Sequence, residues 1–257
     1  MTVAGDLIAH RLGKDYGPDN SATALRRSLA GPLEGVETDV CLTADCELIC
    51  LHDPLLSQVT TLSGWAHERT LAELERASIL RSDGEPAEEP PLTLDQLLEI
   101  TPHELIVQVE VKTQSNPELA RRTAATICER FGRSHERERL EVISFHTGAC
   151  EVAAAAGFKT RLVIWADYAP AVLAGWAMRH DVTGVKVEHF LLSDALVGTL
   201  RAAGITVSTG TVNDVELLEK VLAARPRCIT TDRPHELRAE AVARGLLPVG
   251  YVLAEAA

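Results

Sequence analysis

The chain has 257 residues, of which 46% are hydrophobic and 24% are charged, and its formal net charge is −12. This length is usual for an α/β barrel, and the apolar content is enough to fill one sizeable core. The acidic charge excludes nucleic acid and anionic membrane surfaces as main partners, but local cations can still bind an anionic small molecule.

Short apolar runs recur along the chain and are typical of buried parallel strands. The eight runs cover residues 7–10, 35–40, 105–111, 140–145, 160–165, 184–187, 205–209 and 228–231. Most of them are followed by a segment with apolar residues at helical spacing, and several of these segments begin with a capping residue or an early proline. The expected helices cover residues 19–29, 116–131, 147–156, 169–179, 193–203, 213–223 and 234–244.

This alternation of strands and helices predicts a parallel sheet with helices outside, and eight units predict closure into a (β/α)₈ TIM barrel. The irregular segment at about 53–91 is too long for a simple loop and contains the acidic stretch GEPAEEPP. We interpret it as an insertion between the second and third barrel strands, with a short helix at about 71–79, that walls one side of the active site. The chain 1–257 is therefore expected to form a single domain.

The apolar segments are too short to span a membrane, and the first residues lack the basic region and apolar core of a secretory signal. We therefore expect a cytoplasmic protein without stable membrane insertion. Its six cysteines, at positions 41, 46, 50, 128, 150 and 228, are scattered along the chain. In that compartment most of them should be reduced thiols that pack as small apolar groups.

Ionisable side chains follow three apolar runs near the N-terminus. His10 and Arg11 end the first run, Glu37 and Asp39 lie in the second, and His52 ends a run that begins at position 47. We interpret all three runs as parallel strands that deliver these side chains to one rim. In α/β barrels, that rim carries the active site.

The carboxylates at this rim predict a metal site. Glu37 and Asp39, two residues apart on one strand, point to the same side, and Glu110 ends the third barrel run. Three converging carboxylates repel one another unless a cation is shared, and oxygen ligands suit one Mg²⁺ or Ca²⁺ ion best. An isolated acidic pair of this kind would more often form salt bridges at the rim. The other ionisable residues nearby favour the metal.

The histidines and cations near these carboxylates suit phosphodiester chemistry. His10 and His52 are candidates for a general acid and a general base, since imidazole exchanges protons near neutral pH. Arg11 and Lys112 can bind phosphate oxygens, or they can form rim salt bridges with the same carboxylates. The assignment of acid and base to the two histidines stays open.

The order of short motifs resembles the glycerophosphodiester phosphodiesterase family. The motifs are IAHR, VETDVCLTADCELICLHDP, TTLSGWAHERTLAEL, PPLTLDQLLEI, VQVEVK, TVND and ITTDRP. The resemblance implies a TIM barrel, a divalent metal held by Glu37, Asp39 and Glu110, and catalytic roles for His10 and His52. It also implies hydrolysis of glycerophosphodiesters to glycerol 3-phosphate and an alcohol.

Two positions in the first 20 residues depart from the pattern that this family usually shows. Leu12 stands where glycine usually follows His-Arg, and Asp19 stands where glutamate is usual in the next motif. A glycine position often carries a backbone conformation that other residues reach only with strain. We expect the chemistry to survive both changes, whereas substrate recognition could shift.

Three further residues are possible contacts in the substrate pocket. His146 and Lys186 lie at the ends of predicted strands, and Trp165 offers an aromatic surface for the alcohol. Asn213, in the TVND motif, is expected to cap the following helix.

Two alternatives remain. One is the same chemistry on a lysophospholipid or on a sugar or metabolite phosphodiester, although a long acyl chain needs an apolar entrance that the acidic insertion does not suggest. The other is a barrel that binds a phosphodiester without turnover. The alcohol, the preferred metal, the oligomeric state and the choice between water and the glycerol 2-hydroxyl as nucleophile stay undetermined.

Overall fold

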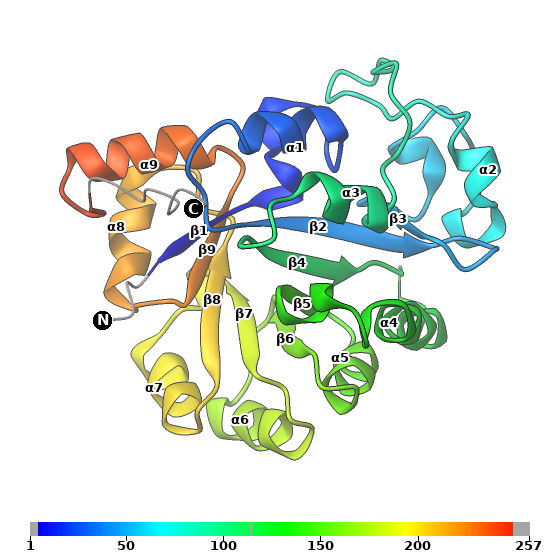
Figure 1. The fold of residues 1–257 in the computed structure, drawn as a ribbon. Coiled ribbons are helices and arrows are strands. Elements are labelled where there is room, and N and C mark those ends of the chain that lie inside the picture. Colours follow the sequence, from blue (N-terminus) through cyan, green and yellow to red (C-terminus); the bar gives the residue numbers. More distant parts are fainter. Residues whose placement is uncertain (1–4, 114, 249–257) are drawn as a thin grey trace.

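The computed structural model describes residues 5–113 and 115–248. Eight of its strands are parallel to their neighbours and form a closed barrel, since β1 pairs with both β9 and β2 (Figure 1). They are β1 (Asp6–Ala9), β2 (Gly35–Leu42), β4 (Ile106–Val111), β5 (Leu140–Ser144), β6 (Lys159–Ile164), β7 (Gly184–Glu188), β8 (Thr206–Gly210) and β9 (Cys228–Thr231). The predicted (β/α)₈ TIM barrel is confirmed.

Helices surround this barrel on the outside (Figure 1). They are α1 (Ala22–Ser28), α4 (Pro117–Phe131), α5 (Thr147–Ala155), α6 (Pro170–Arg179), α7 (Asp194–Ala202), α8 (Val215–Ala223) and α9 (Pro234–Ala243). Side chains that accept a hydrogen bond from the first turn begin α1, α4, α7 and α8, and proline occupies the first turn of α4, α6 and α9. Each of these seven helices begins and ends within about three residues of its predicted bounds.

The barrel interior contains a buried ion pair below the rim. Arg161 on β6 donates from Nε to Glu141 Oε2 on β5 at 2.9 Å, and Gln108 on β4 donates to the same oxygen at 3.0 Å. All three side chains are buried. Burial opposes ionisation of Glu141, but Arg161 and Gln108 hold the pKa of this carboxyl below its usual range.

The run that precedes His52 forms β3 (Leu48–Cys50), which is antiparallel to β2. The prediction of a parallel strand here was wrong, because a tight turn over residues 43–47 reverses the chain. The Thr43 N–H donates to Glu47 O at 2.9 Å, and Cys46 adopts a left-handed φ of 64°. As β3 runs back along β2, the Leu51 N–H donates to Asp39 O at 3.0 Å, so His52 follows at the level of Asp39.

The segment 53–91 lies between β3 and β4 in the chain, and its buried side chains Leu56, Leu74 and Ile79 cluster with Ile49 of β3. Its helix α2 (Leu71–Leu74) is shorter than the predicted 71–79, because Ile79 leaves the helix and pairs with Thr60 in an extended bridge. A helix that was not predicted, α3 (Leu94–Ile100), follows it and is capped by Thr93. Six short 3₁₀ segments also occur in residues 5–113 and 115–248: η1 (His10–Leu12), η2 (Lys14–Tyr16), η3 (Leu56–Gln58), η4 (Ala66–Glu68), η5 (His135–Glu138) and η6 (His189–Leu191).

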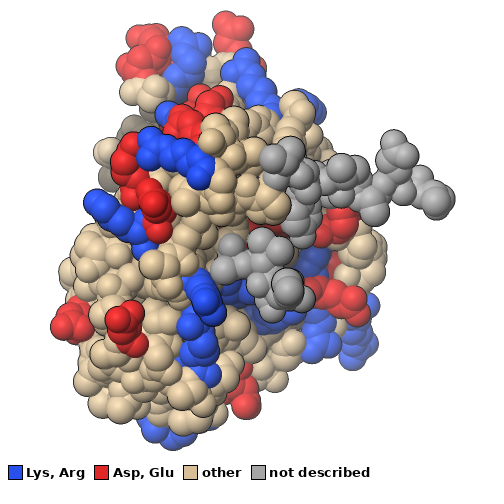
Figure 2. Space-filling model, turned by 90° about the vertical axis from the view of Figure 1, so that its left-hand side faces the viewer, with Lys and Arg blue, Asp and Glu red and all other residues tan. Residues whose placement is uncertain are grey.

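The surface carries charges of both signs. Figure 2 shows one face, on which acidic and basic side chains are interspersed among uncharged ones. The six cysteines are free thiols, and four of them are buried. Among the described residues, no helix is both long enough and apolar enough to cross a membrane.

Candidate active site

The first loop of the barrel turns sharply after β1. Arg11, Leu12 and Gly13 have φ values of 48°, 66° and 97°, so three successive residues are left-handed. This turn brings the Arg11 N–H to Glu37 Oε2 at 2.9 Å, while the Leu12 side chain is fully buried in the core. Leu12 therefore occupies a conformation that glycine adopts without strain.

Three carboxylates converge at the C-terminal ends of β2 and β4. Glu37 and Asp39 lie two residues apart on β2, and Asp39 is paired in register with Glu110 on β4. One oxygen from each of the three lies within 4.8 Å of the others, and all three residues are buried. The predicted metal ligands are thus brought together.

These carboxylates do not ionise equally. Burial opposes ionisation of Asp39, but Lys112, His52 and Arg11 outweigh it and hold its pKa below the usual range. Burial raises the pKa of Glu110 to about 7, Lys112 lowers it, and the charges of Asp39 and Glu37 add to the rise. The buried Glu37 Oε1 accepts no hydrogen bond. Three buried carboxylates thus share one small space, and a hard divalent cation that binds oxygen fits them.

Two cations contact this group. Lys112 Nζ lies 3.2 Å from Asp39 Oδ1 and also contacts Glu110 Oε1. Arg11 donates from Nη1 to Asp19 Oδ2 at 2.6 Å, and its Nε lies 3.7 Å from Asp39 Oδ2. Asp19 thus holds the guanidinium at the rim. Both predicted phosphate ligands lie beside the carboxylates.

Asn20 orients Asp39 and was not singled out in the sequence. Its side-chain N–H donates to Asp39 Oδ2 at 2.9 Å. Its carbonyl oxygen accepts from Thr38 Oγ1 at 2.8 Å and from the Asp39 N–H at 3.1 Å. The sequence did contain a signal for this residue, because Asn20 directly follows Asp19 in the same motif.

His10 is held by a second set of residues that the sequence did not reveal. His10 Nδ1 lies 2.6 Å from Asp232 Oδ1, and Asn213 donates to Asp232 Oδ2 at 2.5 Å. Asn213 Oδ1 in turn accepts from the Asp232 N–H at 2.9 Å. The prediction that Asn213 caps a helix was wrong, because Asp214 caps α8 by accepting from the Leu217 N–H at 2.7 Å. Asn213 and Asp232 lie in the motifs TVND and ITTDRP, so their place in these motifs could have marked them as candidate site residues.

His52 is paired in a similar but more exposed way. Its Nδ1 lies 3.0 Å from Asp53 Oδ2, and the two side chains are 26% and 34% exposed. The corresponding values for His10 and Asp232 are 19% and 13%. With Nδ1 directed at a carboxylate, the Nε2 atom of each ring remains to exchange a proton with a substrate.

The weaker candidates differ in their placement. Lys186, on β7, is buried near enough to Glu110 to lower its pKa. His146 Nε2 lies 3.1 Å from Thr113 Oγ1, and burial lowers the pKa of this imidazole. Trp165, beyond β6, is 67% exposed and touches neither the carboxylates nor the histidines in any hydrogen bond or ring contact of the described residues.

Exposed apolar side chains follow three neighbouring strands at this rim. They are Phe145 after β5, Trp165 and Tyr168 after β6, and Phe190 after β7. Lys112 Nζ lies over the Phe145 ring at 5.6 Å, so this aromatic edge begins beside the carboxylates.

A cavity of about 530 Å³ lies beside Asp19, the partner of Arg11. It is lined by Lys14 and Asp19 of the first loop, by Arg27 of α1, and by Arg81 and Glu89 of the segment 53–91. The insertion thus walls the space beside Asp19.

Comparisons with known proteins agree on one family. The model of the glycerophosphoryl diester phosphodiesterase family matches residues 10–236. A glycerophosphodiester phosphodiesterase of Caldanaerobacter subterraneus subsp. tengcongensis is 27% identical over 238 residues, which cover 90% of this chain and 95% of that protein.

Solved structures share the fold. A phosphodiesterase of Oleispira antarctica, solved in complex with sn-glycerol-3-phosphate, has a TM-score of 0.81 and 23% identity, with 92% of this chain and 96% of that chain covered. A glycerophosphodiester phosphodiesterase of Parabacteroides distasonis has a TM-score of 0.77 and 24% identity, covering 95% and 100%. The family match spans most of the chain and includes the carboxylates and both histidines, so the chain belongs to the glycerophosphoryl diester phosphodiesterase family of hydrolases.

Proposed function

We propose that this protein hydrolyses glycerophosphodiesters to glycerol 3-phosphate and an alcohol in a metal-dependent reaction. The observation that carries the proposal is the placement of two histidine–aspartate pairs around a buried cluster of three carboxylates. Family membership supports the same substrate class.

Glu37, Asp39 and Glu110 would hold one Mg²⁺ or Ca²⁺ ion. Their oxygens lie within 4.8 Å of one another, and Glu37 Oε1 lacks a hydrogen-bond partner. Burial raises the pKa of Glu110, and the charges of Asp39 and Glu37 add to the rise, so a cation shared by the three would favour the ionised form. When bound, such an ion neutralises charge on the phosphate and polarises its phosphorus–oxygen bonds. The ligand set contains only oxygen, which favours hard cations.

Arg11 and Lys112 would bind the non-bridging oxygens of the phosphate. A guanidinium can donate two parallel hydrogen bonds to a phosphate, and an ammonium adds a compact charge. Asp19 fixes the direction of Arg11, whereas Lys112 is held by Asp39 and Glu110. Lys186 is positioned to add a third charge, since it already acts on Glu110.

His10 and His52 would exchange the protons of the reaction through Nε2. One imidazole accepts the proton of the attacking hydroxyl, and the other, protonated, donates to the leaving alkoxide as the phosphorus–oxygen bond breaks. The attacking group is water or the glycerol 2-hydroxyl, and in the second case water then opens a cyclic phosphate. Asp232 and Asp53 hold each ring with Nδ1 turned away from the substrate.

Turnover of a substrate panel tests this proposal. The enzyme with Mg²⁺ should release glycerol 3-phosphate from glycerophosphocholine, glycerophosphoethanolamine or glycerophosphoglycerol, and Glu37→Gln should abolish the release. A matched control is Glu99→Gln, which changes an exposed glutamate on α3. A protein that binds metal and diester but leaves the diester intact would contradict catalysis and support a binding role.

A second candidate substrate class is the lysophospholipids. The exposed edge formed by Phe145, Trp165, Tyr168 and Phe190 provides the apolar entrance that the insertion did not suggest. Because Phe145 contacts Lys112, an alcohol with an acyl chain could lie on this edge while its phosphate remains at the carboxylates. Trp165→Ala should then raise KM for lysophosphatidylcholine and leave glycerophosphocholine unaffected. An equal effect on both substrates would exclude this role.

A further inference from the structure

A second group of possible metal ligands lies at the opposite end of the barrel. His103 lies in the loop between α3 and β4, and His135 and Glu136 lie in η5, between α4 and β5. Since β4 and β5 are neighbouring parallel strands, their N-terminal ends bring these two connections side by side. The carboxylates of the candidate active site lie at the C-terminal ends of the same barrel.

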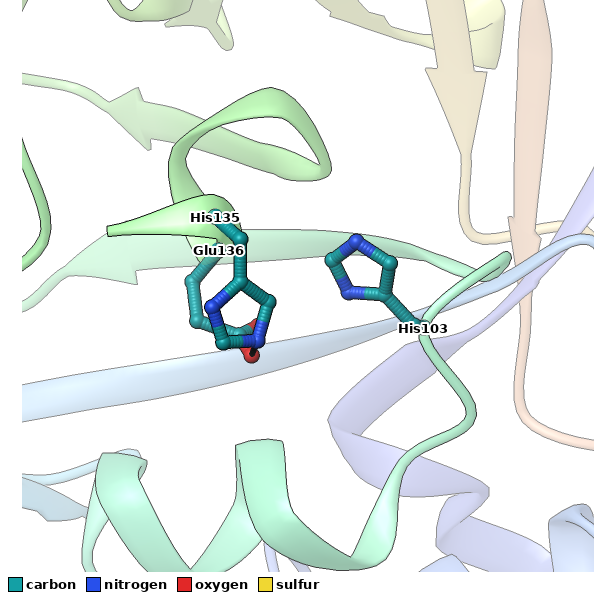
Figure 3. A group of neighbouring side chains, drawn as sticks. All are labelled: His103, His135 and Glu136. Atoms are coloured by element: carbon teal, nitrogen blue, oxygen red, sulfur yellow. Dashed lines mark ion pairs between the residues drawn. The ribbon is translucent and has the colours of Figure 1, made fainter. Parts of the chain in front are cut away.

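The three side chains lie next to one another (Figure 3). The ring centroids of His103 and His135 are 5.0 Å apart, and His135 Nε2 lies 2.9 Å from Glu136 Oε1. One ligand atom from each residue lies within 4.8 Å of the other two. Both histidines are exposed, so small rotations of their side chains can close the remaining distance to a shared ion.

Arg139 fixes the backbone on both sides of this group. Its guanidinium donates to the carbonyl oxygens of Leu98, Thr101 and Pro102 at 2.8–2.9 Å, and its Nε contacts Glu136 Oε2. Arg139 is only 7% exposed. It therefore ties the loop that carries His103 to the turn that carries Glu136, and leaves Glu136 Oε1 directed at His135. Metal sites commonly show such support around their ligands.

We propose that His103, His135 and Glu136 form a second metal site, which takes a divalent ion of the Zn²⁺ type. Two imidazoles and one carboxylate suit Zn²⁺, whereas Mg²⁺ and Ca²⁺ prefer oxygen alone. A water molecule can fill the fourth position from the adjoining cavity of about 420 Å³, which is lined also by Asp95, Glu99 and Phe131. The ion joins two connections that differ by about 30 positions in sequence, so it acts as a structural clamp.

Zn²⁺ titration in the presence of excess Mg²⁺ tests the site, since Mg²⁺ competes at the oxygen ligands of the other cluster. Calorimetry should show that the unchanged protein binds one equivalent of Zn²⁺. His103→Ala and His135→Ala should each lower the Zn²⁺ affinity by more than about 10-fold, because loss of a residue that only supports a ligand already costs about that much. His180→Ala, which removes a half-exposed histidine at the end of α6, is the matched control and should bind as the unchanged protein does.

Thermal unfolding gives a second test, because side chains that only pack against each other would not make the Tm depend on Zn²⁺. Zn²⁺ should raise the Tm of the unchanged protein and of His180→Ala, but not the Tm of His103→Ala or His135→Ala. Both altered side chains are exposed, so the variants should fold. If Zn²⁺ binds both variants with unchanged affinity, or raises their Tm as much as that of the control, the site is excluded.

Discussion

At the scale of single residues, the candidate site depends on side chains that hold other side chains. Asp19 holds Arg11, Asn20 holds Asp39, and Asp232 holds His10. Such residues are not expected to touch the substrate. They fix the direction in which a charge or a proton is presented, and a small error in that direction costs rate.

Asp232→Asn should lower kcat by about 10²–10⁴-fold with little change in KM, because the neutral amide no longer stabilises a protonated His10 or fixes its tautomer. Steady-state kinetics on glycerophosphocholine measure this. Asp181→Asn, an exposed position after α6, is the control. A kcat within twofold of the unchanged enzyme would show that the contact with His10 has no catalytic part.

The leaving group can separate the roles of the two histidines. The p-nitrophenyl ester of glycerol 3-phosphate releases p-nitrophenolate, which is stable as an anion and needs no proton to leave. Loss of the general acid should therefore slow its hydrolysis far less than that of glycerophosphocholine. We expect this relief in only one of His10→Ala and His52→Ala. If both variants lose the same factor on both substrates, the division into acid and base is wrong.

Leu12 sets backbone strain against burial. A left-handed non-glycine residue costs about 1–2 kcal/mol, whereas removing a buried leucine side chain costs about 2–5 kcal/mol. Leu12→Gly should therefore lower the free energy of unfolding by roughly 0–4 kcal/mol. Leu12→Ala should be less stable than Leu12→Gly, because it loses packing and keeps the strain. Urea unfolding of both variants checks this order, and the reverse order would contradict the strain.

At the scale of secondary structure, the barrel was predictable because strands buried on both faces are continuous apolar runs. Each of the eight predicted runs overlaps a barrel strand. The run at Leu48–Cys50 has the same composition, but hydrophobicity does not encode the direction of a strand. The turn at residues 43–47 sets that direction. Its left-handed residue is Cys46, and cysteine is not among the residue types that are typical of turns.

The site was predictable in part for a similar reason. Glu37, Asp39 and Glu110 interrupt apolar strands, where a charge needs an explanation. Asp232 and Asn213 precede helices, where such residues are common as caps. Asp232 acts through its contact with His10, which lies more than 200 positions away in the chain, and Asn213 acts through Asp232.

The assignments of Asn213 and Asp214 lead to opposite expectations for the two variants. Asp214→Ala should lower stability by about 1 kcal/mol without changing kcat, since Asp214 caps α8. Asn213→Ala should lower kcat, because Asp232 loses its hydrogen-bond donor. Chemical unfolding and kinetics on both variants decide this. A loss of kcat in Asp214→Ala alone would reverse the assignment.

At the scale of the whole molecule, the C-terminal rim of the barrel differs from the layer of side chains below it. The C-terminal rim gathers the carboxylates, histidines and aromatic edge, whereas the layer below it holds the buried pair of Glu141 and Arg161. A buried charge left without its partner destabilises a fold strongly. The strands around this pair thus depend on both charges.

Stability should therefore fall in acid. The pKa of Glu141 is lower in the folded than in the unfolded state, so its contribution is fully present above the ordinary glutamate pKa and is lost as the pH falls through the folded value. Glu141→Gln should lower the free energy of unfolding by about 3–5 kcal/mol at pH 7 and flatten its dependence on pH below about 4.5. Urea unfolding between pH 3 and 7 measures both, and an unchanged acid dependence in this variant would contradict the role of Glu141.

The most direct test of the account is release of glycerol 3-phosphate from glycerophosphocholine by protein stripped of metal with EDTA. We predict no turnover in EDTA and recovery on addition of Mg²⁺ or Ca²⁺, with no recovery in Glu37→Gln. Full turnover in the presence of EDTA, or an intact diester with metal bound, would contradict a metal-dependent phosphodiesterase at this site.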